Sequence, residues 1–67
     1  MKALGQGLWE MRIHAGPGYR VYLARRPGGE VVLLTGGDKG SQGRDINRAR
    51  EILAAIERAE SDGTGAV

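Results

Sequence analysis

Clustered glycines divide this sequence into short segments and limit its fold more than any other feature. Twelve of the 67 residues are glycine, against a usual share of about 7%. They fall at positions 5 and 7, 16 and 18, 28 and 29, and 36, 37, 40 and 43, with the others near the C-terminus. Up to Gly37 the intervals are short, which is typical of strands separated by turns. After Gly43 a longer interval is left, and there is no internal repeat.

Two of the short segments alternate between apolar and polar residues, which predicts half-buried strands. In residues 8–13, Trp9, Met11 and Ile13 point to one side. In residues 19–25, the matching residues are Tyr19, Val21 and Leu23. We expect these six side chains to face the core. The intervening Ala-Gly-Pro-Gly at 15–18 suits a chain reversal.

A third segment, residues 30–35, is apolar on both faces, so we expect it to be the most covered strand. The Pro-Gly-Gly at 27–29 forms the turn before it. The three segments together predict an antiparallel β-meander.

The pattern then changes to a helical period from about Arg44 to Glu60. Asp38 or Ser41 can cap this helix. Its apolar stripe consists of Ile46, Ala49, Ile52, Leu53 and Ile56. The predicted fold class is therefore α+β, with a three-stranded antiparallel meander followed by one C-terminal helix. Residues 1–60 form a single domain, and residues 61–67 are a flexible tail.

A chain of 67 residues without cysteine has few means of stabilising a small core. We therefore expect a dimer or a bound partner. The net charge of +2 permits nucleic-acid binding without requiring it. No segment resembles a membrane span or a signal peptide, so the expected location is the cytoplasm. No metal cluster or cofactor motif is present, and none is expected.

The pairing of the first two strands brings basic residues together. Registers that keep the apolar residues on one face place either Arg12 opposite Arg20, or His14 opposite Arg20 and Arg12 opposite Tyr22. Both put all four residues on one face. Like charges opposite each other destabilise a sheet, so the pattern favours an external anion. Phosphate suits guanidinium groups because they bind it in a bidentate fork, and Tyr22 can stack on a base.

A plainer interpretation of the same residues stays open. The arginines can be solvated face residues, with Glu10 neutralising one of them, and His14 can be a surface or turn residue. The glycine-rich link at 35–44 can be no more than a cap and a turn. Its functional interpretation adds Lys39 and Gln42 to a phosphate site with Arg20, since helix N-termini attract phosphate.

Two ordered motifs resemble one known family. They are Glu10-Met-Arg-Ile-His-Ala-Gly-Pro-Gly-Tyr-Arg-Val-Tyr22, and Leu34-Thr-Gly-Gly-Asp-Lys-Gly-Ser-Gln42 followed by Asp45-Ile46. Their order and separation resemble the addiction-module killer proteins, a HigB-like branch of the RelE/ParE toxin superfamily. The resemblance covers roughly residues 4–57.

The resemblance implies helices packed on a small antiparallel sheet and a toxin of a bacterial toxin–antitoxin pair. Many such toxins cleave mRNA in the ribosomal A site without metal, by attack of a ribose 2′-hydroxyl on the next phosphate. It implies catalytic roles for Arg20, Lys39 and His14. The remaining candidates are the RNA-binding residues Arg12, Tyr22, Gln42 and Arg44. The implied partners are a cognate antitoxin and the ribosome with its mRNA.

The usual N-terminal helical hairpin of this family is lacking here, so one sheet face is expected to be bare and to form a homodimer. Three functions follow as hypotheses. The first is a ribosome-dependent mRNA endonuclease. The second is a ParE-like toxin that binds DNA gyrase without cleaving RNA. The third is an inactive toxin that only binds an antitoxin or another copy of itself.

Overall fold

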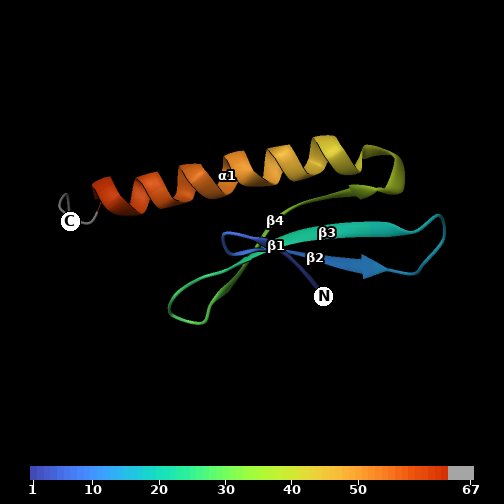
Figure 1. Ribbon diagram of the computed structural model, residues 1–67, viewed down its shortest axis with the longest axis horizontal. Coiled ribbons are helices and arrows are strands. Elements are labelled where there is room, and N and C mark those ends of the chain that lie inside the picture. Colours follow the sequence, from blue (N-terminus) through green and yellow to red (C-terminus); the bar gives the residue numbers. More distant parts are fainter. Residues whose placement is uncertain (64–67) are drawn as a thin grey trace.

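The computed structural model describes residues 1–63, and its elements run in the order β1, β2, β3, β4, η1, α1. The strands are β1 (Lys2–Gly5), β2 (Leu8–Ile13), β3 (Tyr19–Arg25) and β4 (Val31–Asp38). A short 3₁₀ turn, η1 (Lys39–Ser41), leads into the long helix α1 (Gln42–Gly63). Figure 1 shows this helix lying along the sheet. The α+β class with one C-terminal helix is confirmed, but the sheet has four strands rather than three.

The additional strand is β1, at one edge of the sheet. It is joined to β2 by a tight turn in which Gln6 has φ 55° and Gly7 has φ 84°. Positive φ at both central residues is typical of the hairpin turn whose twist matches the flanking strands. The four residues of β1 carry no β-branched side chain, so the sequence gives little strand signal there.

The sheet is an antiparallel meander with strand order β1-β2-β3-β4. β2 and β3 adopt the first of the two expected registers, with Arg12 opposite Arg20. The register of β3 with β4 shifts between Tyr22 and Leu23, where a bulge admits Leu34. Leu34 thereby packs against the core together with Leu4 and Ile46.

The helix covers the face opposite to the one expected. Leu8, Tyr22 and Ala24 are buried beneath α1, whereas Met11 and Ile13 are exposed. The expectation that alternating apolar residues face the core is wrong for this sheet, because both faces carry apolar side chains. The covered face buries the whole side chain of Tyr22, and the buried Glu10 Oε1 on this face accepts hydrogen bonds from Tyr22 and Gln42.

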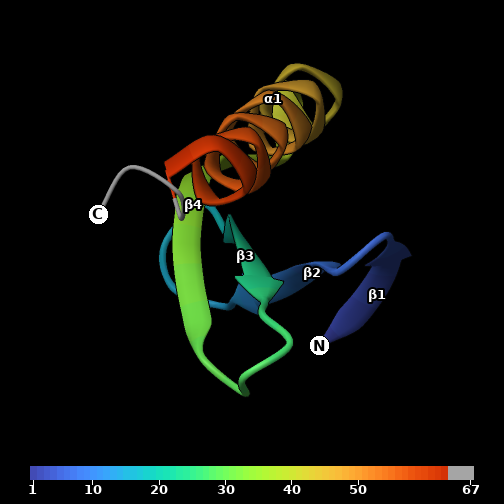
Figure 2. The same ribbon diagram turned by 90° about the vertical axis from the view of Figure 1, so that its left-hand side faces the viewer.

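β4 is an edge strand and not the most covered one. Val31 is 59% exposed and Leu33 is 67% exposed. An edge strand has a neighbour on one side only, and α1 covers only one of its faces (Figure 2). β3, which lies between two strands, is the most buried strand: Tyr22 and Ala24 are buried beneath the helix, and Leu23 is buried on the other face between Trp9 and Leu33.

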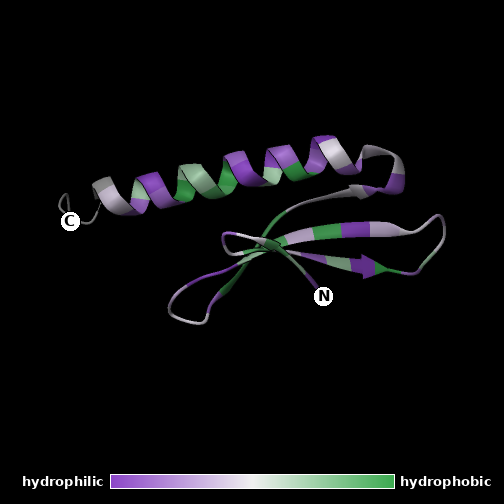
Figure 3. Ribbon diagram, viewed as in Figure 1, coloured by the Kyte–Doolittle hydropathy of each residue, from purple (hydrophilic) through white to green (hydrophobic). Residues whose placement is uncertain are grey.

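The apolar stripe of α1 is confirmed, with Ala49 and Leu53 buried against the sheet. Figure 3 shows the apolar turns of the helix interrupted by hydrophilic ones. Asp38 caps η1 by accepting a 3.1 Å hydrogen bond from the Ser41 amide. The helix continues to Gly63, so the first three residues of the predicted tail are helical. Residues 64–67 of that tail lie outside the described residues.

Two contacts outside the core fix the helix on the sheet. Arg26, in the turn after β3, pairs with Glu57 and Glu60 near the helix C-terminus. Arg50 donates a 2.9 Å hydrogen bond to the Leu4 carbonyl oxygen in β1. The helix is thus tied to the loop at one end of the sheet and to the β1 edge.

A side chain at position 37 is predicted to destabilise the fold. A Cβ there would overlap the Asp45 carboxylate and lie 2.6 Å from Ser41 Oγ. Gly37→Ala should therefore lower the free energy of unfolding by about 1–3 kcal/mol, as overpacking commonly does. Gly43→Ala is the matched control, because a Cβ in that helical position meets nothing within 4 Å. It should be neutral or stabilising. Urea unfolding of both variants measures their free energies of unfolding. Equal values for Gly37→Ala and Gly43→Ala would contradict the close approach of Asp45 and Ser41 to Gly37.

Candidate functional site

A shallow pocket of about 200 Å³ lies at the end of the β2–β3 hairpin. The hairpin turn is closed by a 3.0 Å hydrogen bond from the Gly18 amide to the Ala15 carbonyl oxygen. The start of η1 adds Lys39 to the pocket wall. The lining residues are Arg12, Ile13, His14, Pro17, Gly18, Tyr19, Arg20 and Lys39.

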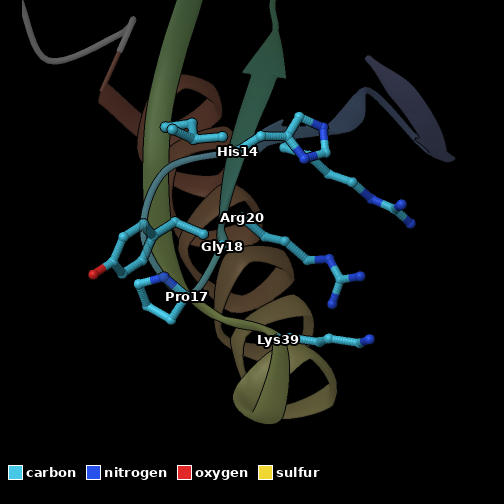
Figure 4. A pocket seen from close by; sticks show the side chains of 8 residues that line it. His14, Pro17, Gly18, Arg20 and Lys39 are labelled. Carbon is cyan, nitrogen blue, oxygen red and sulfur yellow. The ribbon is translucent and has the colours of Figure 1, made fainter.

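This pocket brings together Arg12, His14, Arg20 and Lys39, which are four of the seven site residues predicted from sequence. Arg12, His14 and Lys39 are exposed, and Arg20 is partly buried. Figure 4 shows the Arg20 and Lys39 side chains extending in the same direction from neighbouring elements. The prediction that Arg12 and Arg20 share one face is confirmed by their register.

Arg20 is not a free cation. Its Nε lies 3.3 Å from Glu10 Oε1, and its Nη1 donates a 3.1 Å hydrogen bond to Gln42 Oε1. The possibility that Glu10 neutralises one arginine is therefore realised at Arg20. Arg12 makes no ion pair within residues 1–63, so its charge faces solvent.

Glu10 is the anchor of this arrangement and is only 1% exposed. Besides the ion pair with Arg20, its Oε1 accepts hydrogen bonds from Gln42 Nε2 at 3.1 Å and from the Tyr22 hydroxyl at 3.4 Å. Its Oε2 is buried and has no hydrogen-bond partner within the described residues. Burial, above all, and the Glu10 carboxylate raise the pKa of the Tyr22 phenol.

Two of the predicted RNA-binding residues, Tyr22 and Arg44, lie away from the pocket, whereas Gln42 lies beside Arg20, as the functional interpretation of the glycine-rich link predicts. Tyr22 is completely buried, so the prediction that it stacks on a base is wrong. The sheet face that carries Tyr22 is covered by α1, and the alternation of side chains along the strand does not show which face is covered. Gln42 bridges Glu10 and Arg20 from the start of the helix. Arg44 is exposed on α1 beside Asn47 and Arg48, outside the pocket.

The structure adds Lys2 to the basic residues. β1 places Lys2 opposite Glu10, and a second hollow of about 280 Å³ next to it shares Arg12 and His14 with the first. Lys2, Arg12, His14, Arg20 and Lys39 form what we call the basic groove. Lys2 is absent from the residues predicted to form the site, because the sequence pattern does not predict β1.

The basic groove is suited to an elongated anion. Among the described residues Lys2, Arg12 and Lys39 form no ion pair, and they line the groove together with His14 and the Arg20–Glu10 pair. No cluster of three or more metal-ligating side chains occurs among the described residues. In the same part of the chain, no helix has the length and apolarity that crossing a membrane requires.

The raised pKa of Tyr22 predicts a loss of stability in alkali. The unfolded chain releases the phenolic proton from about pH 10 while the folded chain keeps it, so folding stability falls above pH 10. Tyr22→Phe should flatten the alkaline slope and cost about 1 kcal/mol at pH 7 through the lost hydrogen bond. Tyr19→Phe, at an exposed position, is the control and should keep the wild-type slope. Urea unfolding from pH 8 to 11 measures this, and an unchanged slope in Tyr22→Phe would refute it.

Comparisons with known proteins place the chain in a family. Residues 1–60 match the profile of a family described as "Phage derived protein Gp49-like (DUF891)". A Haemophilus influenzae protein described as uncharacterized is 48% identical over 56 residues. The matched segment is 84% of this chain and 57% of that protein, so the chain spans little more than half the length of this relative. No solved structure matches. Because the profile covers nearly the whole sequence, the chain belongs to the Gp49-like family of phage-derived proteins.

Proposed function

We propose that the chain is the toxin of a bacterial type II toxin–antitoxin pair, related to the HigB-like branch of the RelE/ParE superfamily. The family match and the two ordered motifs at Glu10–Tyr22 and Leu34–Gln42 support this. The single observation that carries the proposal is the basic groove, in which Lys2, Arg12 and Lys39, unpaired among the described residues, line two adjoining hollows together with the His14 imidazole. Its activity would be metal-independent cleavage of mRNA on the ribosome, in the cytoplasm.

In this reaction a ribose 2′-hydroxyl attacks the adjacent phosphorus and the bond to the 5′-oxygen breaks. The products are a 2′,3′-cyclic phosphate and a 5′-hydroxyl. His14 would take the proton of the attacking hydroxyl or deliver one to the leaving oxygen, with water completing the exchange. Arg12 and Lys39 would stabilise the charge that develops on the phosphoryl oxygens.

The role of Arg20 differs from that of the free cations. Its Nε and Nη1 are directed to Glu10 and Gln42, which fixes the plane of the guanidinium group at the pocket wall. A fixed guanidinium can offer its remaining edge to a phosphate in one orientation without losing side-chain entropy. The Glu10 carboxylate offsets the positive charge of Arg20. Arg12 and Lys39 would therefore provide most of the electrostatic stabilisation that was expected of Arg20.

A cognate antitoxin would cover the basic groove, most simply with an acidic segment that meets Lys2, Arg12 and Lys39. A second candidate function is binding without cleavage. The ion pair of Arg20 with Glu10 favours this alternative. Gyrase binding has no such support, because no feature of the described residues favours it over binding to RNA or to an antitoxin.

Induced expression followed by mapping of mRNA 5′ ends tests the proposal. The wild-type chain should arrest growth and produce cuts in phase with codons. Arg12→Ala and Lys39→Ala should each reduce cutting about 100-fold, as loss of a transition-state contact commonly does. Arg58→Ala is the matched control, because this exposed arginine lies near the far end of α1. Growth arrest with DNA damage and no cuts would indicate gyrase binding instead. Normal growth without cuts would indicate that the chain binds a partner and cleaves nothing.

A further inference from the structure

The sheet face turned away from α1 carries a continuous apolar surface. Across the strands, Trp9, Leu23 and Leu33 lie side by side, and Met11 lies beside Val21. The large apolar side chains exposed on the described residues of this face are Met11, Ile13, Tyr19, Val31 and Leu33. A contiguous exposed patch of this kind on a small protein usually marks an association surface.

Charges occur only at the two ends of this face within the described strands. Arg25 lies opposite Val31 at one end of the β3–β4 pair, and Asp38 lies opposite Tyr19 at the other. Both residues are exposed. The seven residues of β3 span roughly 20 Å at about 3.3 Å per residue. Arg25 and Asp38 are therefore too far apart to pair within one chain.

We propose that this face binds a second copy of the chain, about a two-fold axis that lies between the sheets and runs perpendicular to the strands. Such an axis reverses the strand direction and keeps β3 over β3. It places Arg25 of each chain above the end of the partner sheet that carries Asp38, and the apolar centres above each other. An isologous interface requires this kind of self-complementary surface. The inference is independent of the proposed nuclease activity.

The size of the face sets the expected strength of the dimer. Four strands at about 4.8 Å spacing and roughly 20 Å in length give a small interface. The flat area of about 400 Å² on each chain is well below the roughly 800 Å² per partner of a standard interface, and areas of this size are typical of weak association. We therefore expect a dimer that dissociates on dilution, with two ion pairs at the rim fixing the register more than the affinity.

Sedimentation equilibrium over a range of concentrations tests the proposal. The wild-type chain should show a monomer–dimer equilibrium, and Leu33→Lys should abolish it. Arg25→Glu and Asp38→Lys should each weaken the dimer about tenfold by placing like charges opposite each other. The double variant should restore the wild-type dissociation constant within about threefold, because the pairs are re-formed with exchanged signs. Arg44→Glu, on α1, is the charge control and should have no effect.

The single and double variants at Arg25 and Asp38 distinguish an effect on association from an effect on folding. Asp38 also caps η1, so Asp38→Lys can lower stability, but a change at Arg25 cannot repair a cap. Recovery of the dimer in the double variant can therefore come only from contact between chains. A wild-type monomer at all concentrations would overturn the proposal. So would a dimer that persists in Leu33→Lys, or one that the double variant fails to restore.

Discussion

The carboxylate of Glu10 is the interaction on which the remainder of this structure depends. It is buried beneath α1 and joins three elements, β2 through its own backbone, β3 through Arg20 and Tyr22, and α1 through Gln42. A buried carboxylate without such partners would be strongly destabilising. The three donors make it possible for the helix to cover a sheet face that carries charge, and they fix where the helix begins relative to the hairpin.

The same carboxylate determines the character of the basic groove. It neutralises Arg20 and holds it in place, while Arg12 and Lys39 keep their charges at the surface. In the proposed function the groove would offer an anion the fixed guanidinium of Arg20 and the exposed charges of Arg12 and Lys39. Because α1 covers this face, the more apolar face of the sheet is left open, and association of two chains would bury it. The position of α1 on the sheet therefore accounts both for the basic groove and for the exposed apolar face.

Much of this arrangement follows from sequence pattern. The alternation in residues 8–13 and 19–25 restricts the register to two choices, one of which is observed. The spacing from Ile46 to Ile56 predicts the helix stripe. The covered face could not be predicted, because a strand with apolar residues on both sides does not indicate which one the helix contacts. The pattern therefore places Tyr22 on the surface, and it gives no sign of Lys2, whose strand depends on a tight turn with positive φ.

A double-mutant cycle between Glu10 and Arg20 tests the central role of this carboxylate most directly. Glu10→Gln, Arg20→Met and the double variant would be compared with the wild type by urea unfolding at pH 7. A favourable coupling of about 1–3 kcal/mol between the two side chains is expected, since each single change leaves the other group buried with its partner missing. Additive effects, with a coupling near zero, would contradict it.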